Sequence, residues 1–180
     1  MMILITAAGK DRPGIVAALS RVLTEAGCNI EDTSMTRLRG EFAMIVIVRP
    51  PRGITMGVLG TRFRVIQKRL GLSILMKELT REESDRAKSA LTRPTMISVY
   101  GADRPGIVSR VTGLLAERKI NITDLNTRVV GSKRRPVYVM VMEAELPGKL
   151  SIAALERDLE KLRRGLQVDI TLHPIETAQL

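Results

Sequence analysis

The sequence predicts an α+β protein made of two ferredoxin-like βαββαβ units, each an antiparallel sheet with helices on one face. The first observation is a repeated octet, because GKDRPGIV at residues 9–16 returns as GADRPGIV at residues 101–108. The second is that the match continues beyond the octet at the same spacing, as Asn29 and Asn121 show. The third is that each copy orders its apolar patterns as strand, helix, strand, strand, helix, strand.

The duplication predicts a first unit at residues 1–80, a linker at 81–92, a second unit at 93–176 and a tail at 177–180. A chain of 180 residues holds one domain or two small ones, at roughly 100–200 residues per domain. The polar stretch TREESDRAKSALTRP between the units reads as a linker or as a short helix leading into the second unit. Extra residues in the second copy fall around GSKRRP, a turn-like segment of the kind that tolerates insertions.

In the first unit, the apolar run MILITAA predicts the first strand. Apolar residues then recur at helical spacing over residues 15–26, and Gly27 is placed to end that helix. NIEDTSMTRL and EFAMIVIV predict two strands joined by a tight turn at residues 39–40. Residues 59–70 give a second helical face, and LSILMKEL predicts the closing strand.

The second unit repeats this order. TMISVY, NITDLNTRVV, VYVMVMEAEL and LQVDITLHP predict its strands, and the patterns at 107–115 and 152–162 predict its helices. The sheet face away from the helices must be solvated or covered. Met44, Met140 and the aliphatic residues near them indicate that another unit or another chain covers part of that face.

Each octet joins the first strand of its unit to the first helix. Gly9 permits a tight exit from the strand, and Pro13 suits the first helical turn. Asp11 is placed to cap free N–H groups, and Gly14 lets a ligand approach the helix start, where a carboxylate or phosphate is favoured. A well-capped turn without a ligand explains the same residues. The second copy repeats them at Gly101, Pro105, Asp103 and Gly106.

Asn29 and Asn121 each begin the strand that follows the first helix. If the sheets pair edge to edge, each asparagine lies near the loop of the neighbouring unit. Its side chain offers a donor and an acceptor, which suits the carboxylate and ammonium groups of an amino acid. A purely structural role for each asparagine, in the turn between helix and strand, is equally compatible with the sequence. Asp32 and Asp124 are placed to face an ammonium group or only water.

The segments DRPGIV, GCNIED and EFAMIVIV of the first unit, and DRPGIV, KINITD and VYVMVMEAELP of the second, resemble those of ACT domains. ACT domains are small modules that bind amino acids and regulate metabolism. Two such units, with GCNIED in the first, are similar to the glycine cleavage system transcriptional repressor group. The octet also opens formyltetrahydrofolate deformylases, but those enzymes need a further catalytic domain for which no residues remain here.

The resemblance implies that a ligand lies where the first loop and helix start of one unit meet the second strand of a paired unit. The copies differ at Lys10 against Ala102 and at Glu31 against Thr123, so one site is expected to be altered or silent. The implied ligand-binding residues are Asp11, Gly14, Ile15, Asn29 and Ile30, and in the second copy Asp103, Gly106, Ile107, Asn121 and Ile122.

The same resemblance implies an amino-acid ligand, with glycine suggested by the group, and no cofactor. It also implies action through a partner regulatory protein, a DNA-binding activator, rather than on DNA itself. A homodimer is one arrangement that would pair the units, and the sequence leaves the oligomeric state open.

The formal net charge of +10 favours acidic partners, although the spread of Lys and Arg is also typical of a solvated surface. Basic stretches occur at RFRVIQKR, SKRRP and Arg163–Arg164. RNA-binding modules of this fold stack bases on sheet aromatics, and the aromatic residues here are few. Direct nucleic-acid binding, or an adaptor role without sensing, is the alternative function. The aromatic residues are Phe42, Phe63, Tyr100 and Tyr138.

Catalysis is not expected, because Cys28 is the only cysteine, His173 is the only histidine, and no phosphate-binding loop or metal cluster is visible. Glu143 and Glu145 share a face of one strand and could serve acid–base chemistry, but a solvated sheet edge explains them as well. No apolar run is long enough to span a membrane, and the N-terminus lacks the features of a signal peptide. A cytoplasmic protein without membrane contact is therefore expected.

Overall fold

The computed structural model describes residues 1–80, 92–132 and 135–175. The chain divides into two compact units, Met1–Ser89 and Ala90–Leu180. Of the predicted linker at 81–92, only Thr92 lies within the described residues, where it begins a strand, and the tail at 177–180 lies outside them. No helix among the described residues is long and apolar enough to cross a membrane.

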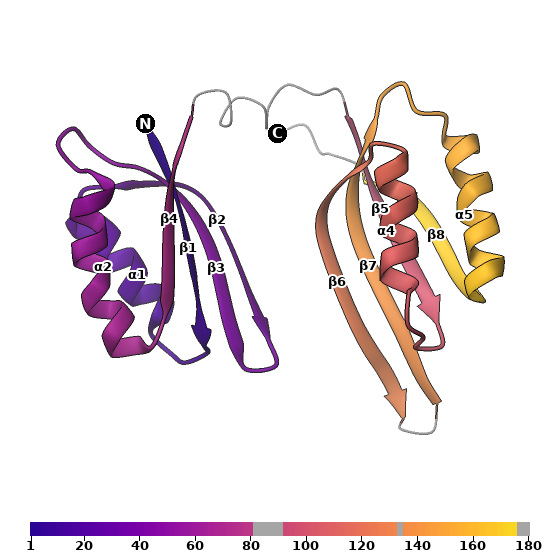
Figure 1. Ribbon diagram of the computed structural model, residues 1–180, viewed down its shortest axis with the longest axis horizontal. Helices are drawn as coiled ribbons and strands as arrows, with labels where there is room; N and C mark the ends of the chain where they lie inside the picture. The colour runs from indigo at the N-terminus through magenta and orange to yellow at the C-terminus, as the bar shows by residue number, and fades with distance from the viewer. Residues whose placement is uncertain (81–91, 133–134, 176–180) are drawn as a thin grey trace. The chain divides into compact units, whose positions relative to one another are not determined.

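The first unit has the predicted order of elements (Figure 1). Its four strands form an antiparallel sheet in the order β2-β3-β1-β4, and both helices lie on one face of that sheet. The elements are β1 (Met2–Lys10), α1 (Ile15–Glu25), β2 (Asn29–Leu38), β3 (Glu41–Arg49), α2 (Met56–Leu70) and β4 (Ser73–Leu79).

The second unit repeats this plan, with an antiparallel sheet in the order β6-β7-β5-β8. The predicted fold class, two ferredoxin-like α+β units, is confirmed. The elements are β5 (Thr92–Gly101), α4 (Ile107–Glu117), β6 (Asn121–Ser132), β7 (Arg135–Pro147), α5 (Ile152–Leu166) and β8 (Val168–Pro174).

Each unit has its own hydrophobic core between sheet and helices. Met44 and Met140 belong to these cores, with 8% and 0% of their surface exposed, so the prediction that they lie on the outward sheet face was wrong. The reason is the phase of the strand: Phe42 and Met44 point toward the helices, and Ile45, which follows Met44, points outward and is exposed. An apolar outward face exists, but other residues form it.

Gly27 ends α1 as predicted. It has a φ of 69°, and the Cys28 N–H donates to the carbonyl of Leu23 at 2.9 Å, which is the bond that defines a Schellman motif. The corresponding position after α4 is Lys119, which adopts the same left-handed conformation (φ 56°) without being glycine. The helix stop is therefore set by the geometry of the motif in both units, and by glycine only in the first.

The β2–β3 turn at residues 39–40 has φ values of 49° and 85°, as a two-residue hairpin of type I′ requires. In the second unit the extra residues do not simply enlarge a loop. They lengthen both strands, because pairing continues through Val130↔Val137 to Ser132↔Arg135.

The basic pair Arg163–Arg164 on α5 is held by nearby carboxylates, Glu160 for both arginines and Asp169 for Arg163. Arg163 Nε lies 2.6 Å from one carboxylate oxygen of Glu160, and Arg164 Nε lies 2.8 Å from the other. Hydrogen bonds from Arg163 and then Arg164, together with their charges, lower the pKa of Glu160 from 4.5 to about 2. This stretch of the sequence is therefore not a free cationic patch.

A lowered folded-state pKa means that Glu160 stabilises the fold above its ordinary pKa, and that this contribution is lost as the pH falls from about 4.5 through about 2. We expect Glu160→Gln to remove part of the acid dependence in that window. Thermal unfolding of both proteins from pH 6 to pH 2 measures the effect. Identical acid dependence in the two proteins would contradict the assignment.

Candidate functional site

The first octet begins inside β1, where Gly9 pairs with Phe42. A Cβ at Gly9 would lie 2.9 Å from the Gly71 carbonyl oxygen and 2.9 Å from Leu72 Cδ2. In the second unit, a Cβ at Gly101 would lie 2.7 Å from Val168 Cγ1. Glycine is needed at both positions because another segment of the same unit passes directly over them. The predicted reason, a tight exit from the strand, was wrong.

Helix α1 starts at Gly14, whose φ of 91° is in the left-handed region. No side chain caps this end, so the prediction that Asp11 caps the helix was wrong. The Asp11 N–H donates to the Gly40 carbonyl at 2.9 Å, and its carboxylate lies 3.5 Å from Arg37 Nη1. Asp11 therefore ties the loop to the β2–β3 hairpin. Pro13 precedes the helix and is not in its first turn.

The uncapped start leaves backbone donors available. The first bond inside α1 runs from the Ala18 N–H to the Gly14 carbonyl at 2.9 Å, so the N–H groups before Ala18 have no partner within the helix. Gly106 begins α4 in the same way, with a φ of 93° and no side-chain cap. Both helix starts thus present free donors and the positive end of the helix dipole, which suits a carboxylate.

Ile15 and Ile107 are the first residues of these helices, and 2% and 1% of their surface is exposed. Their side chains fill the cores and are not available to a ligand. What they can offer is the backbone N–H. A Cβ at Gly14 would meet no atom within 4 Å, so the positive φ of this residue, and not close packing, is what demands glycine.

Asn29 and Ile30 lie at the other end of the first unit. Asn29 pairs with Arg49 across the sheet, whereas Lys10 and Leu38 both pair with Glu41. At about 3.3 Å per strand residue, roughly 26 Å of β3 separates the two ends. One unit alone therefore does not bring Asn29 to the Asp11–Gly14 loop.

The side chain of Asn29 donates to Glu31 Oε1 at 2.8 Å, and Arg49 Nε lies 3.2 Å from the same carboxylate. The strand register shifts between Ile30 and Asp32, so Glu31 is the extra residue of a β-bulge. The difference between Glu31 and Thr123 noted in the sequence thus falls on a structural feature beside the asparagine.

In the second unit the register shifts at the equivalent place, between Ile122 and Asp124. The side chain of Asn121 contacts a residue of the neighbouring strand β7 instead, because its Nδ2 donates to Glu145 Oε2 at 3.5 Å. Glu145 therefore accepts a hydrogen bond from the Asn121 side chain, as Glu31 does from the Asn29 side chain. The two asparagines are held by acidic partners of different origin, which gives the two copies different surroundings.

The strands that carry the asparagines are edge strands. All ten residues of β2 are exposed, Ile30 among them, and in β6 only Ile122 is half-buried. Exposed edge strands offer unpaired backbone groups to a neighbouring strand.

Another difference between the two copies lies beside the second loop, where Tyr138 stands at the position that Phe42 has in the first unit. Tyr138 pairs with Gly101 as Phe42 pairs with Gly9. Its hydroxyl is buried and no described group meets hydrogen-bond geometry with it. Burial raises the pKa of Tyr138, the nearby Thr127 hydroxyl opposes the rise, and the Asp103 carboxylate adds to it. The Phe-to-Tyr difference at matched positions was the signal available in the sequence.

Tyr138→Phe is expected to raise the stability of the second unit by about 1 kcal/mol, because it removes a buried hydroxyl without a partner. Urea unfolding measures the change. Tyr100→Phe is the matched control, since Tyr100 is 41% exposed and its loss of a hydroxyl should change little. A clear loss of stability in Tyr138→Phe would show that the hydroxyl has a partner.

The residues weighed for other functions are structural or exposed. Cys28 packs half-buried against the first core, and burial raises the pKa of its thiol, with Arg62 opposing the rise. His173 is exposed on β8. Among the described residues, no group of three His, Cys, Asp or Glu is arranged to hold a metal. Phe42, Phe63 and Tyr138 are buried, which leaves Tyr100 as the exposed aromatic.

Comparison with known proteins agrees with the fold of both units. Two models of the ACT-domain family match the chain, one over residues 1–77 and the other over residues 95–164. The chain therefore belongs to the ACT-domain family and carries two such domains in tandem.

Among its relatives is the glycine cleavage system transcriptional repressor of Escherichia coli (strain K12), which is 27% identical over 180 residues, covering 98% of this chain and 92% of that protein. A UPF0237 protein of Methanocaldococcus jannaschii is 46% identical over 76 residues, covering 42% of this chain and 80% of that protein. The crystal structure of an unknown protein from Galdieria sulphuraria superposes with a TM-score of 0.82 and 26% identity, covering 97% of this chain and 98% of that one. The chain is thus an ACT-domain regulator related to the repressor.

Proposed function

We propose that this protein is a non-catalytic regulator that binds an amino acid between paired ACT units and acts through a partner protein in the transcriptional control of amino-acid metabolism. The observation that carries the proposal is that the two parts of the predicted site lie far apart within each unit. The free helix start and the asparagine lie at opposite ends of each unit, joined by an exposed edge strand. Two units paired along that edge would complete two sites.

In such a paired site, the backbone donors at Gly14 or Gly106 would bind the ligand carboxylate. The asparagine oxygen and the nearby acidic groups would receive its ammonium, with Glu31 near one site and Glu145 near the other. Both functional groups common to all amino acids would then be recognised. Glycine is the first candidate, because the repressor relative is named for glycine cleavage.

Regulation would follow from linkage. A ligand that contacts two units binds more tightly to the arrangement in which they are paired, so it shifts the population toward that arrangement. The paired arrangement would offer a partner protein a different surface from the unpaired one. The coupling is limited to the difference in ligand affinity between the two arrangements.

A thermal-shift screen of the full chain against each of the twenty amino acids at millimolar concentration tests the proposal. A ligand present at 100 times its Kd should stabilise the protein by about 3 kcal/mol. The variant Asn29→Ala/Asn121→Ala should lose the shift, whereas Asn126→Ala, a matched asparagine on β6, should keep it. No shift with any amino acid, or an undiminished shift in the double variant, would refute the proposed site.

A further inference from the structure

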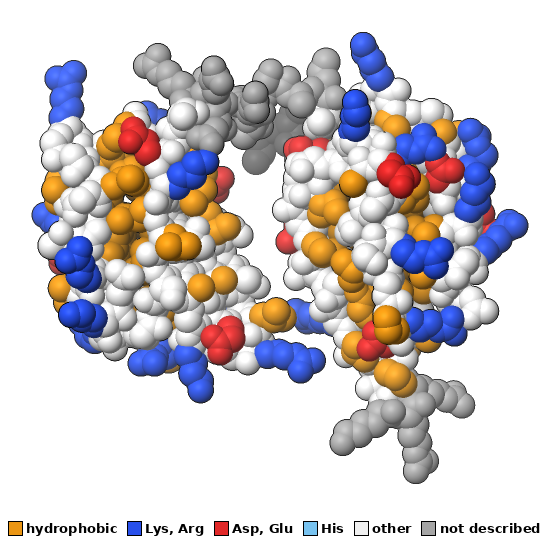
Figure 2. Space-filling model, in the orientation of Figure 1, with side chains coloured by type: hydrophobic (Ala, Val, Ile, Leu, Met, Phe, Trp, Pro, Cys, Tyr) orange, Lys and Arg blue, Asp and Glu red, His pale blue; other side chains and the backbone are white. Residues whose placement is uncertain are grey.

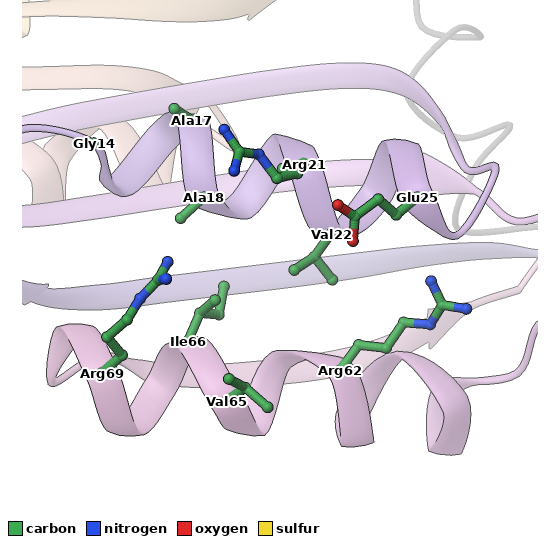
Figure 3. A pocket seen from close by; sticks show the side chains of 10 residues that line it. All are labelled: Gly14, Ala17, Ala18, Arg21, Val22, Glu25, Arg62, Val65, Ile66 and Arg69. Atoms are coloured by element: carbon green, nitrogen blue, oxygen red, sulfur yellow. The ribbon is translucent and has the colours of Figure 1, made fainter.

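A groove runs between α1 and α2 on the outer side of the first unit (Figure 3), with a volume of about 630 Å³. Its floor is apolar. Ala18 and Val22 point from α1 toward α2, and Ile66 points from α2 toward α1. Val65 lines the same groove with 66% of its surface exposed, so apolar surface in the groove is open to a partner. We call this the α1–α2 groove.

The edges of the α1–α2 groove are cationic. Arg21 comes from α1, and Arg62 and Arg69 come from α2, against the single carboxylate of Glu25. Among the described residues, none of these three arginines forms an ion pair or a hydrogen bond. This contrasts with Arg163 and Arg164 of the second unit, which share Glu160. Figure 2 shows other Lys and Arg side chains spread around both units.

The dimensions of the α1–α2 groove favour a helical segment over a small metabolite. Its lining extends along α1 from Gly14 to Glu25, a rise of about 16 Å at 1.5 Å per residue. That is three helical turns. An apolar strip of this length, flanked by charge, is the surface that an amphipathic helix occupies when it binds in a groove.

The corresponding surface of the second unit is a smaller pocket, with a volume of about 390 Å³. Where Ala18 stands in the first unit, the second has Arg110, and Leu114 takes the place of Val22. Arg118 and Asp158 join α4 to α5 through an ion pair across the equivalent groove. The larger groove, edged by three arginines, is thus a property of the first unit and not a general consequence of the fold.

The charge of the α1–α2 groove distinguishes between three possible occupants: a second copy of the chain, nucleic acid and an acidic helix. A second copy of the chain placing the same groove against this one would bring its arginines against these arginines, which is unfavourable. Nucleic acid would use the arginines but would leave the exposed Val65 and the apolar floor without a function. An acidic amphipathic helix satisfies both the floor and the edges.

We propose that the α1–α2 groove is the docking surface for a partner protein, which inserts an amphipathic helix bearing aliphatic residues at i, i+3 or i+4, and i+7, flanked by Asp and Glu. The inference rests on the proposed function only in that the regulator acts through a protein partner. It assigns that contact to the face formed by α1 and α2, which shares only Gly14 with the residues proposed for the amino-acid site.

The test uses the full chain and a designed probe, a fluorescein-labelled 18-residue peptide with leucine at those spacings and glutamate on both flanks. Fluorescence anisotropy should show saturable binding to the wild-type protein. Arg62→Glu/Arg69→Glu should weaken it by about tenfold or more. Arg64→Glu/Lys68→Glu is the matched control, because it makes the same total charge change on α2 at exposed positions outside the groove, and it should bind within about threefold of wild type.

A second variant separates a helix from nucleic acid. Ala17 is exposed in the groove, so Ala17→Arg adds positive charge while covering the apolar floor. It should weaken peptide binding, and it would strengthen the binding of a DNA duplex. The proposal is overturned if the peptide does not bind, if the double variant binds as wild type does, if a peptide with lysine in place of glutamate binds equally well, or if Ala17→Arg binds more tightly. Circular dichroism confirms that each variant is folded.

The two proposals fail separately. The amino-acid thermal shift is measured on Arg62→Glu/Arg69→Glu as well, and it should match wild type. An intact amino-acid response without peptide binding overturns only the docking surface. Peptide binding without any amino-acid response overturns only the sensing function.

Discussion

Alanine at Gly9 or Gly101 is expected to destabilise its unit by about 1–3 kcal/mol or more, the cost of overpacking a tightly packed site. The new methyl group would stand 2.9 Å from the carbonyl oxygen of Gly71 in one case and 2.7 Å from Val168 Cγ1 in the other. Backbone cannot move aside without disturbing β4, and the β-branched Val168 has few alternative rotamers. Urea unfolding of each variant, followed by circular dichroism, measures the loss.

Gly113→Ala is the control, because the same methyl group added within α4 meets nothing within 4 Å. It should stabilise the second unit by about 1 kcal/mol through helix propensity. A loss of stability at Gly9 and Gly101 with a gain at Gly113 would show that the requirement for glycine comes from the segments that pass over the two sites, Gly71–Leu72 and β8. If Gly101→Ala proved as stable as wild type, the close approach of β8 to β5 would be refuted.

Lysine in the middle of each edge strand is expected to abolish the response to an amino acid. Ser34→Lys/Asn126→Lys introduces a charge into the exposed strands β2 and β6, which protects an edge against pairing. The unliganded fold should change by less than about 1 kcal/mol, since both positions are exposed. The ligand-induced rise in Tm should disappear, as measured by differential scanning fluorimetry.

Leu75→Lys/Thr171→Lys makes the matched change on β4 and β8, the opposite edge strands of the two sheets. Both positions are exposed, and this variant should keep the full response. A normal response in Ser34→Lys/Asn126→Lys would mean that the ligand does not need the β2 and β6 edges, and the paired site would have to be abandoned.

Local sequence signals predicted the elements well, because each is decided by neighbours along the chain. The switch from strand to helical periodicity after each octet placed α1 and α4, and Gly27 marked the end of α1. The turn at residues 39–40 followed from a glycine that tolerates positive φ. Because the chain is duplicated, the same signal occurred at the matched position of the second copy and supported each prediction twice.

Contacts between distant segments could not be predicted in the same way. EFAMIVIV is apolar on both faces, so no alternation of polar and apolar residues showed that Met44 points inward and Ile45 points outward. Asp11 lost its expected capping role to Arg37 and Gly40, which come from the β2–β3 hairpin.

The candidate site and the α1–α2 groove show the same limit. Asn29 was placed correctly at the start of β2, but its bond to Glu31 depends on a bulge that no periodicity reveals. Arg62 and Arg69 were visible as part of a basic stretch, yet the groove they border exists only once α2 packs beside α1. Which charges remain unpaired is a property of that packing.

The most direct test of amino-acid binding between paired units is an NMR titration of the ¹⁵N-labelled full chain with glycine, followed by any other amino acid that stabilises the protein. We expect saturable shifts at the backbone amides of Gly14, Gly106, Asn29 and Asn121. All four should saturate at one ligand concentration if the two sites are alike, and at two concentrations if the copies differ. Shifts confined to other residues, or none at millimolar ligand, would contradict amino-acid binding between paired units.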